Sequence, residues 1–83
     1  MWAMYVLHCR DGSFYCGITT DTQRRINEHN GLSPRGAKYT RSRRPVILIY
    51  EEAHLDRSSA AKAESRFKKL SRLKKEKYLS DHT

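Results

Sequence analysis

The chain has 83 residues, enough for one folded domain, residues 1–83, with a small hydrophobic core. Its formal net charge of +8 favours a polyanionic partner, most commonly nucleic acid, over a merely soluble basic surface. No apolar run approaches the roughly 18–20 residues that span a membrane, and no signal-peptide pattern opens the chain. We therefore expect a cytoplasmic protein that does not bind membranes.

Residues 2–9 and 14–19 are rich in aromatic and aliphatic side chains and are predicted to form two strands. The Asp11-Gly12 pair between them predicts a hairpin. A two-residue turn would place Tyr5 and Tyr15 on opposite faces of the sheet, whereas a three-residue loop with Gly12 in the left-handed region places both on one face. Asp-Gly is compatible with either loop, so the sequence leaves this open.

The first helix is predicted to begin at the capping box formed by Thr20 and Gln23 and to run to about Asn30, where Gly31 ends it. The segment 31–44 that follows is a long loop with five basic residues. Loops of this length are uncommon in small domains and often carry function.

The third strand is predicted at residues 45–50, and its nearly continuous apolar character indicates that both of its faces are covered. Asp56 or Ser58 caps a helix that runs to Leu70, and Ser71 caps a final helix that runs to about residue 79. The order β-β-α-β-α-α predicts an α+β domain with helices packed on the faces of the sheet.

Glu64 lies within an otherwise apolar stripe of the helix predicted around residues 58–70. The apolar members of that stripe recur at helical spacing and are Ala60, Ala63, Phe67 and Leu70. Because a buried carboxylate without a partner is costly, we expect Glu64 to meet a cation, a set of hydrogen-bond donors or a metal. A structural ion pair with a nearby arginine is the alternative.

The first predicted helix has a similarly unusual inward face. Arg25 and His29 are four residues apart and therefore share one face, with Ile26 as the single large apolar residue beside them. The alternative is an exposed helix that is held by Ile26 and turns Arg24, not Arg25, toward the sheet.

Five sequence elements resemble the GIY-YIG nuclease family in order and spacing. They are Met4-Tyr5-Val6, Tyr15-Cys16-Gly17-Ile18-Thr19, Arg24-Arg25, His29-Asn30 and Glu64. The match runs from Tyr5 to about Leu70 and is similar above all to small stand-alone bacterial members, which share a segment like Gly36 to Arg41. Ala3 replaces the first glycine of the family pattern, and Cys16 replaces an aliphatic residue. Neither change removes a reacting group.

The resemblance implies a three-stranded antiparallel sheet with the first strand central and helices on its faces. It also implies phosphodiester hydrolysis by a metal-dependent endonuclease, with Tyr5, Tyr15, Arg25, His29 and Glu64 as the catalytic residues. We expect Glu64, as the one carboxylate that we can place on the site face, to hold one divalent cation, Mg²⁺ or Mn²⁺. Arg25 would bind phosphoryl oxygens, and Tyr15 would position the phosphate or the water.

Tyr5 and His29 compete for the role of general base in this interpretation. A hydroxyl near a metal and an arginine would lose its proton more easily, as proposed for Tyr5 in the family. His29 titrates near neutrality and is the other candidate.

Further basic and aromatic residues are predicted to contact nucleic acid. Those of the long loop can follow phosphates, with Tyr39 available to stack on a base, and basic residues of the last helices add to them. The predicted set is Arg35, Lys38, Tyr39, Arg41, Arg43, Arg44 and Lys68. Because no base-reading module is present, selectivity is expected to follow nucleic-acid shape or a protein partner that supplies targeting, with DNA favoured over RNA.

Two other functions fit the same residues. The first is a basic nucleic-acid-binding module with the nuclease fold but without catalysis, in which loss of Glu64 changes no activity. The second is a structural protein, such as an accessory of a ribonucleoprotein, in which Tyr5, Arg25 and Glu64 form only a buried network. In that case Glu64→Ala mainly destabilises the fold.

Overall fold

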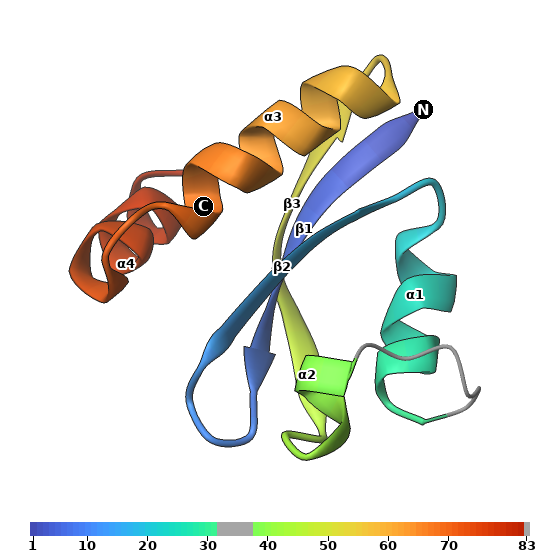
Figure 1. Ribbon diagram of the computed structural model, residues 1–83, viewed down its shortest axis with the longest axis vertical. Helices are drawn as coiled ribbons and strands as arrows, with labels where there is room; N and C mark the ends of the chain where they lie inside the picture. The colour runs from blue at the N-terminus through green and yellow to red at the C-terminus, as the bar shows by residue number, and fades with distance from the viewer. Residues whose placement is uncertain (32–37, 83) are drawn as a thin grey trace.

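The computed structural model describes residues 1–31 and 38–82 and shows an α+β fold built on a three-stranded antiparallel sheet in the order β2-β1-β3 (Figure 1). The strands are β1 (Trp2–Cys9), β2 (Phe14–Thr19) and β3 (Val46–His54). Hydrogen bonding on both sides makes β1 the central strand. The predicted fold class and the central position of the first strand are thus confirmed.

The hairpin between β1 and β2 has the three-residue loop that the sequence left open. Leu7 pairs with Tyr15 and His8 with Phe14, so the loop occupies residues 10–12 and Gly12 takes a positive φ of 87°. In this register Tyr5 pairs with Gly17, and the Tyr5 and Tyr15 side chains lie on one face of the sheet.

The helices cover the sheet from both sides (Figure 1). The first face carries α1 (Thr22–His29) and the one-turn α2 (Lys38–Arg41), and the second carries α3 (Arg57–Lys68) and α4 (Arg72–Asp81). None of the helices in the described ranges is long and apolar enough to cross a membrane.

Each face of the sheet carries its own apolar cluster. Tyr5, Leu7 and Cys9 of β1 pack with Ile26 on the first face. Met4 and Val6, the alternate residues of the same strand, pack with Phe67 and other side chains of α3 and α4 on the second. The alternation of a strand therefore divides the residues of β1 between two different environments.

Helix starts follow the predicted chemistry with one exception. Asp56 caps α3 and Ser71 caps α4, each accepting a hydrogen bond from a backbone N–H in the first turn. For α1 the cap is Asp21 and not Thr20, because the Asp21 carboxylate accepts from Arg24 N at 3.1 Å. Gly31 follows the end of α1 with a positive φ of 95°, as predicted for its stop.

The prediction that the third strand is covered on both faces is wrong for β3. It forms an edge of the sheet, and Ile47 is 62% exposed. A register shift opposite Val6 and Leu7 bulges β3 at Ile49, because Val6 pairs with Tyr50 while Leu7 pairs with Leu48. Leu48 consequently packs on the first face and Tyr50 on the second.

Candidate active site

The ring of Tyr5 packs directly against Gly17 in the candidate site. They are partners across the β1–β2 ladder, and a Cβ at residue 17 would lie 2.5 Å from Tyr5 Oη and 2.7 Å from its Cζ. The tyrosine ring thus occupies the space that any other residue at 17 would fill. Tyr15, two residues earlier on β2, has its ring centroid 6.5 Å from that of Tyr5.

A chain of hydrogen bonds joins Tyr5, His29 and Thr40. Tyr5 Oη lies 2.9 Å from His29 Nε2, and His29 Nδ1 lies 2.9 Å from Thr40 Oγ1. Both His29 and Thr40 are 0% exposed. Each residue comes from a different element (β1, α1 and α2), so this relay forms only when the three elements have packed together. Sequence analysis missed Thr40, although it belongs to the segment 36–41 that the family resemblance includes.

His29 is a neutral imidazole at physiological pH. Its pKa is lowered to about 4, first by burial and then by the positive charge of Arg25. A neutral imidazole has one donor and one acceptor nitrogen. The tautomer with its proton on Nδ1 donates to Thr40 and leaves Nε2 to accept the proton of Tyr5.

The pKa of Tyr5 is raised, because burial and the neighbouring Tyr15 outweigh the charge and the hydrogen bond of Arg25. The side chain is only 1% exposed. The protein's own residues therefore hold Tyr5 as a neutral phenol at pH 7. The charge and the hydrogen bond of Arg25 lower the pKa of Tyr5, as expected, but their effect is smaller than that of burial, and the role of Tyr5 as general base stays a prediction.

Arg25 turns toward the sheet and Arg24 is exposed, as predicted for the inward face of α1. The guanidinium of Arg25 forms an ion pair with the carboxylate of Glu28, with Nη1 to Oε1 at 2.8 Å. Glu28 is itself buried, so the premise that Glu64 is the only carboxylate on this face is wrong. Its burial is tolerated because the partner three residues earlier neutralises it. Sequence analysis missed Glu28, although the R-x-x-E spacing of Arg25 and Glu28 is typical of an ion pair within a helix.

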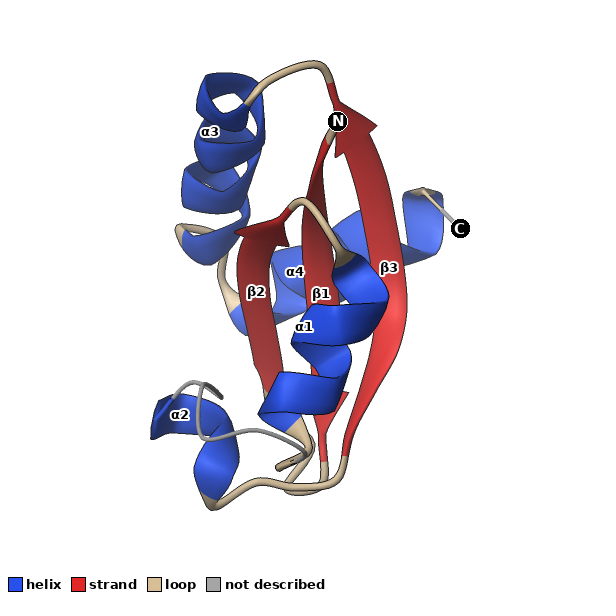
Figure 2. Cartoon of the chain, turned by 90° about the vertical axis from the view of Figure 1, so that its right-hand side faces the viewer, coloured by secondary structure: helices blue, strands red, loops and turns tan. Residues whose placement is uncertain are grey.

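Glu64 belongs to α3, and α3 and α1 lie on different sides of the sheet (Figure 2), with α3 packing on the second face and Tyr5 on the first. Its side chain is 23% exposed, and Oε2 lies 3.2 Å from Lys68 Nζ. The predicted cation partner is thus a lysine. The pKa of Cys16 is raised first by burial and second by the negative charge of Glu64. The Glu64 carboxylate therefore lies near Cys16 of β2. Strand β2 is an edge of the sheet, with α3 on the second face and the Tyr5 relay on the first.

A divalent cation fits Glu64 only as a site with one protein carboxylate. Within residues 1–31 and 38–82, no three His, Cys, Asp or Glu side chains gather as a metal-binding cluster. Mg²⁺ keeps several waters and is commonly held by one or two carboxylates together with substrate phosphates. The partly exposed carboxylate of Glu64 fits that mode of binding.

In the described part of the basic loop, Arg43 and Arg44 contact other residues of the protein. Arg43 Nε lies 2.9 Å from Asp11 Oδ2, and its guanidinium stacks 3.9 Å from the ring centre of Tyr39. Arg44 Nε donates to the backbone oxygen of His29 at 2.7 Å. These two arginines therefore support the site. Arg41 is exposed, whereas Arg35 and the side chain of Lys38 lie outside the described residues.

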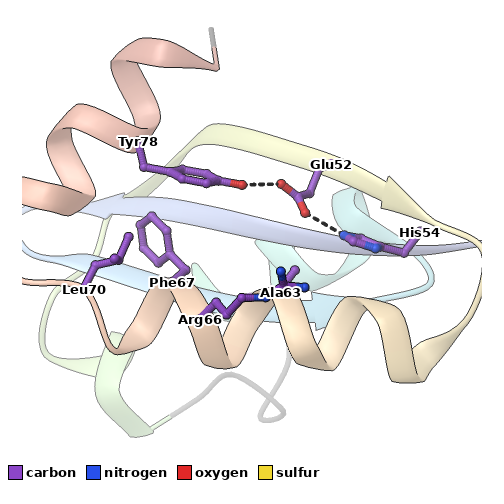
Figure 3. A pocket seen from close by; sticks show the side chains of 7 residues that line it. All are labelled: Glu52, His54, Ala63, Arg66, Phe67, Leu70 and Tyr78. Atoms are coloured by element: carbon purple, nitrogen blue, oxygen red, sulfur yellow. Dashed lines mark hydrogen bonds and ion pairs between the residues drawn. The ribbon is translucent and has the colours of Figure 1, made fainter.

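A pocket of about 240 Å³ lies between β3, α3 and α4 on the second face (Figure 3). At its polar end, Glu52 accepts hydrogen bonds from the Tyr50 and Tyr78 hydroxyls, both at 2.7 Å, and contacts His54 at 2.6 Å. Burial raises the pKa of Glu52, but these three partners outweigh it and the pKa is lowered. The carboxylate thus links β3 to α4.

Comparison with known proteins gives the family. The model of the GIY-YIG catalytic domain matches residues 1–78. The chain belongs to the GIY-YIG domain family. A UPF0213 protein of Enterococcus faecalis is 60% identical over 77 residues, which cover 90% of this chain and 85% of that protein.

Two solution structures of relatives confirm the fold. The UPF0213 protein from Bacillus halodurans is 44% identical with a TM-score of 0.64, and the match covers 99% of this chain and 86% of that one. A protein from E. faecalis is 56% identical with a TM-score of 0.64, covering 95% and 82%. The GIY-YIG family is a nuclease family, so the candidate site is best interpreted as one for phosphodiester chemistry.

Proposed function

We propose that this GIY-YIG protein is a divalent-metal-dependent endonuclease that hydrolyses phosphodiester bonds, with DNA favoured over RNA, and selects its substrate by structure. The observation that carries the proposal is the Tyr5–His29–Thr40 relay, with Arg25 beside Tyr5. Within this relay the neutral imidazole of His29 can accept a proton from Tyr5, and the negative charge of a bound phosphate would raise the lowered pKa of His29.

The relay also offers a solution to the competition between Tyr5 and His29. A water at Tyr5 Oη would pass its proton to Tyr5 while Tyr5 passes its own proton to His29 Nε2. The water oxygen then forms its bond to phosphorus as the bond to the leaving oxygen breaks; the departing oxygen takes a proton from solvent, and His29 releases its extra proton to solvent. Tyr5 stays neutral throughout, which agrees with its raised pKa. Because Tyr5 is 1% exposed, substrate binding has to open a path to its hydroxyl.

Arg25 provides the fixed positive charge for the non-bridging phosphate oxygens. Its ion pair with Glu28 holds the guanidinium in place, and 24% of its side chain is exposed. Tyr15 lies between Tyr5 and Tyr39, with ring centroids 6.5 Å and 5.7 Å away, and would position the phosphate.

Glu64 would hold the divalent cation from the other side of the edge strand β2. The cation, when bound, supplies stabilisation of the charge that develops on the phosphoryl oxygens. A substrate that runs along the β2 edge would meet Arg25 and Glu64 from opposite sides. The exposed Arg41, together with Lys68, would then add attraction for phosphates away from the scissile bond.

The proposal is tested with a panel of end-labelled DNA and RNA substrates (duplex, single strand, flap and branched), incubated with Mg²⁺, Mn²⁺ or a chelator. We expect metal-dependent cleavage of at least one structured DNA and none with the chelator. Binding of the panel without cleavage under any metal condition would favour the non-catalytic binding module.

A further inference from the structure

A pocket of about 300 Å³ lies beside the turn that leads from β2 into α1. One part of its wall is apolar and is formed by Trp2 and Ile18. The other part is polar and is lined by Thr19, Thr20, Arg24, Arg25 and Glu28, of which the last two form an ion pair that leaves the pocket with one net positive charge. Because Arg25 belongs both to this pocket and to the surroundings of Tyr5, the pocket opens next to the proposed phosphate position.

The indole of Trp2 is the aromatic surface of this pocket. Trp2 is half-buried at the start of β1, and the guanidinium of Arg57 lies 5.8 Å from its ring centre. Aromatic rings beside arginines are the arrangement on which proteins stack single-stranded bases, since every base has a flat face that tolerates this contact. A simple anion would need the arginines but would gain nothing from the tryptophan.

We propose that this pocket receives one unpaired nucleobase, which stacks on Trp2 while the adjoining phosphate lies at Arg25. The inference rests on the proposed nuclease function and adds the origin of its selectivity. A base within a duplex is covered on both faces by its neighbours, so it must unstack before it can enter, whereas a base in a flap, a junction or a single strand pays little of that cost.

Fluorescence tests this proposal directly, because Trp2 is the single tryptophan of the chain. The protein is titrated with three nucleic acids in turn: a short single strand, the same strand with abasic sites, and a duplex. The buffer contains Ca²⁺ in place of Mg²⁺. Binding is followed independently by the anisotropy of an oligonucleotide label, and a gel verifies that the strands stay intact. We expect the single strand to quench at least half of the emission and the abasic strand and the duplex to leave it nearly unchanged.

Other results separate the two proposals. Equal affinity for all three nucleic acids with unchanged emission would overturn the base pocket and leave the nuclease proposal standing. Failure of every oligonucleotide to change the anisotropy would overturn both.

Substitution of the ring gives a second measurement. Trp2→Leu is expected to weaken single-strand binding about tenfold and to leave duplex binding unchanged, whereas Trp2→Phe keeps most of the affinity. Phe14→Leu is the matched control, because Phe14 is also half-buried, carries the guanidinium of Arg72 at 4.1 Å from its ring centre, and does not line the pocket. Thermal melting verifies that Trp2→Leu and wild type are both folded. The proposal would be contradicted if the two proteins then had the same ratio of single-strand to duplex affinity.

Discussion

Tyr5 Oη and His29 Nε2 lie 2.9 Å apart in the interior of the protein, and the other nitrogen of His29 lies 2.9 Å from Thr40 Oγ1. Burial holds Tyr5 as a phenol and His29 as a neutral imidazole, so the pair carries no net charge at pH 7. The pair is thus a proton path that stays uncharged until a reaction delivers a proton. Consequences of this arrangement can be measured without knowledge of the natural substrate.

The neutral state of His29 makes stability depend on pH. Its pKa is about 4 in the folded protein, against 6.5 as the usual value. Between these values the unfolded chain binds a proton that the folded chain does not bind, so the free energy of unfolding falls as pH falls, by at most about 1.4 kcal/mol per pH unit. His29→Gln keeps a polar group but cannot titrate, so its urea-denaturation midpoint should fall less than that of wild type between pH 6.5 and 4.5. Parallel pH curves for the two proteins would show that His29 is not the titrating group.

Gly17→Ala is expected to destabilise the protein by about 1–3 kcal/mol, because the new Cβ would meet the Tyr5 ring, whose nearest atoms are 2.5 and 2.7 Å away. Chemical denaturation measures the loss. A double-mutant cycle with Tyr5→Leu supplies the control, since the cost of the alanine should shrink once the ring is absent. An unchanged cost in that background would mean that the clash lies elsewhere.

Arg25→Lys should lower nuclease activity by about 10- to 100-fold, because lysine keeps the charge but loses the planar fork that binds two oxygens at once. Arg10→Lys is the control at an exposed position outside the candidate site and should change the rate little. Single-turnover cleavage rates at saturating protein distinguish the chemical step from binding. Equal effects of the two substitutions would remove Arg25 from the proposed phosphate site.

Glu52→Gln is expected to cost about 1–3 kcal/mol of stability, because the carboxylate accepts from two tyrosine hydroxyls and contacts His54. Cleavage by the folded variant should be near the wild-type rate, since the hydrogen-bond partners of Glu52 are Tyr50, His54 and Tyr78 and none of the proposed catalytic residues. Glu51→Gln, at the next residue on the opposite face of β3, provides the comparison in urea denaturation. A large loss of cleavage by well-folded Glu52→Gln would place this network in the active site.

The sequence predicted features that depend on neighbours along the chain. Helical spacing correctly placed Arg25 and His29 on one inward face, and the capping residues Asp56 and Ser71 follow from local hydrogen bonding. Strand alternation narrowed the hairpin to two choices. The strand register decides between them, because His8 pairs with Phe14, and Asp11 lacks the positive φ that a two-residue type I′ turn would require.

Features that depend on tertiary packing could not be predicted in the same way. Periodicity shows which side of α3 turns inward, but it does not show that the helix covers the face of the sheet opposite Tyr5. Thr40 meets His29 only through the path of the connection between α1 and β3. The bulge at Ile49 depends on pairing with β1, which the apolar run of β3 does not reveal.

The most direct test of the central claim compares Glu64→Gln with Glu76→Gln in Mg²⁺-dependent cleavage of the best substrate in the panel. Both glutamates form helical ion pairs with a basic residue four positions away, Glu64 with Lys68 at 3.2 Å and Glu76 with Arg72 at 3.8 Å. Loss of one such surface pair changes stability by at most about 1 kcal/mol. We predict that Glu64→Gln loses at least about 100-fold in cleavage rate, as expected for the loss of a metal ligand, and still binds the substrate, whereas Glu76→Gln cleaves like wild type. Equal cleavage by the two variants would contradict a metal-dependent nuclease centred on Glu64.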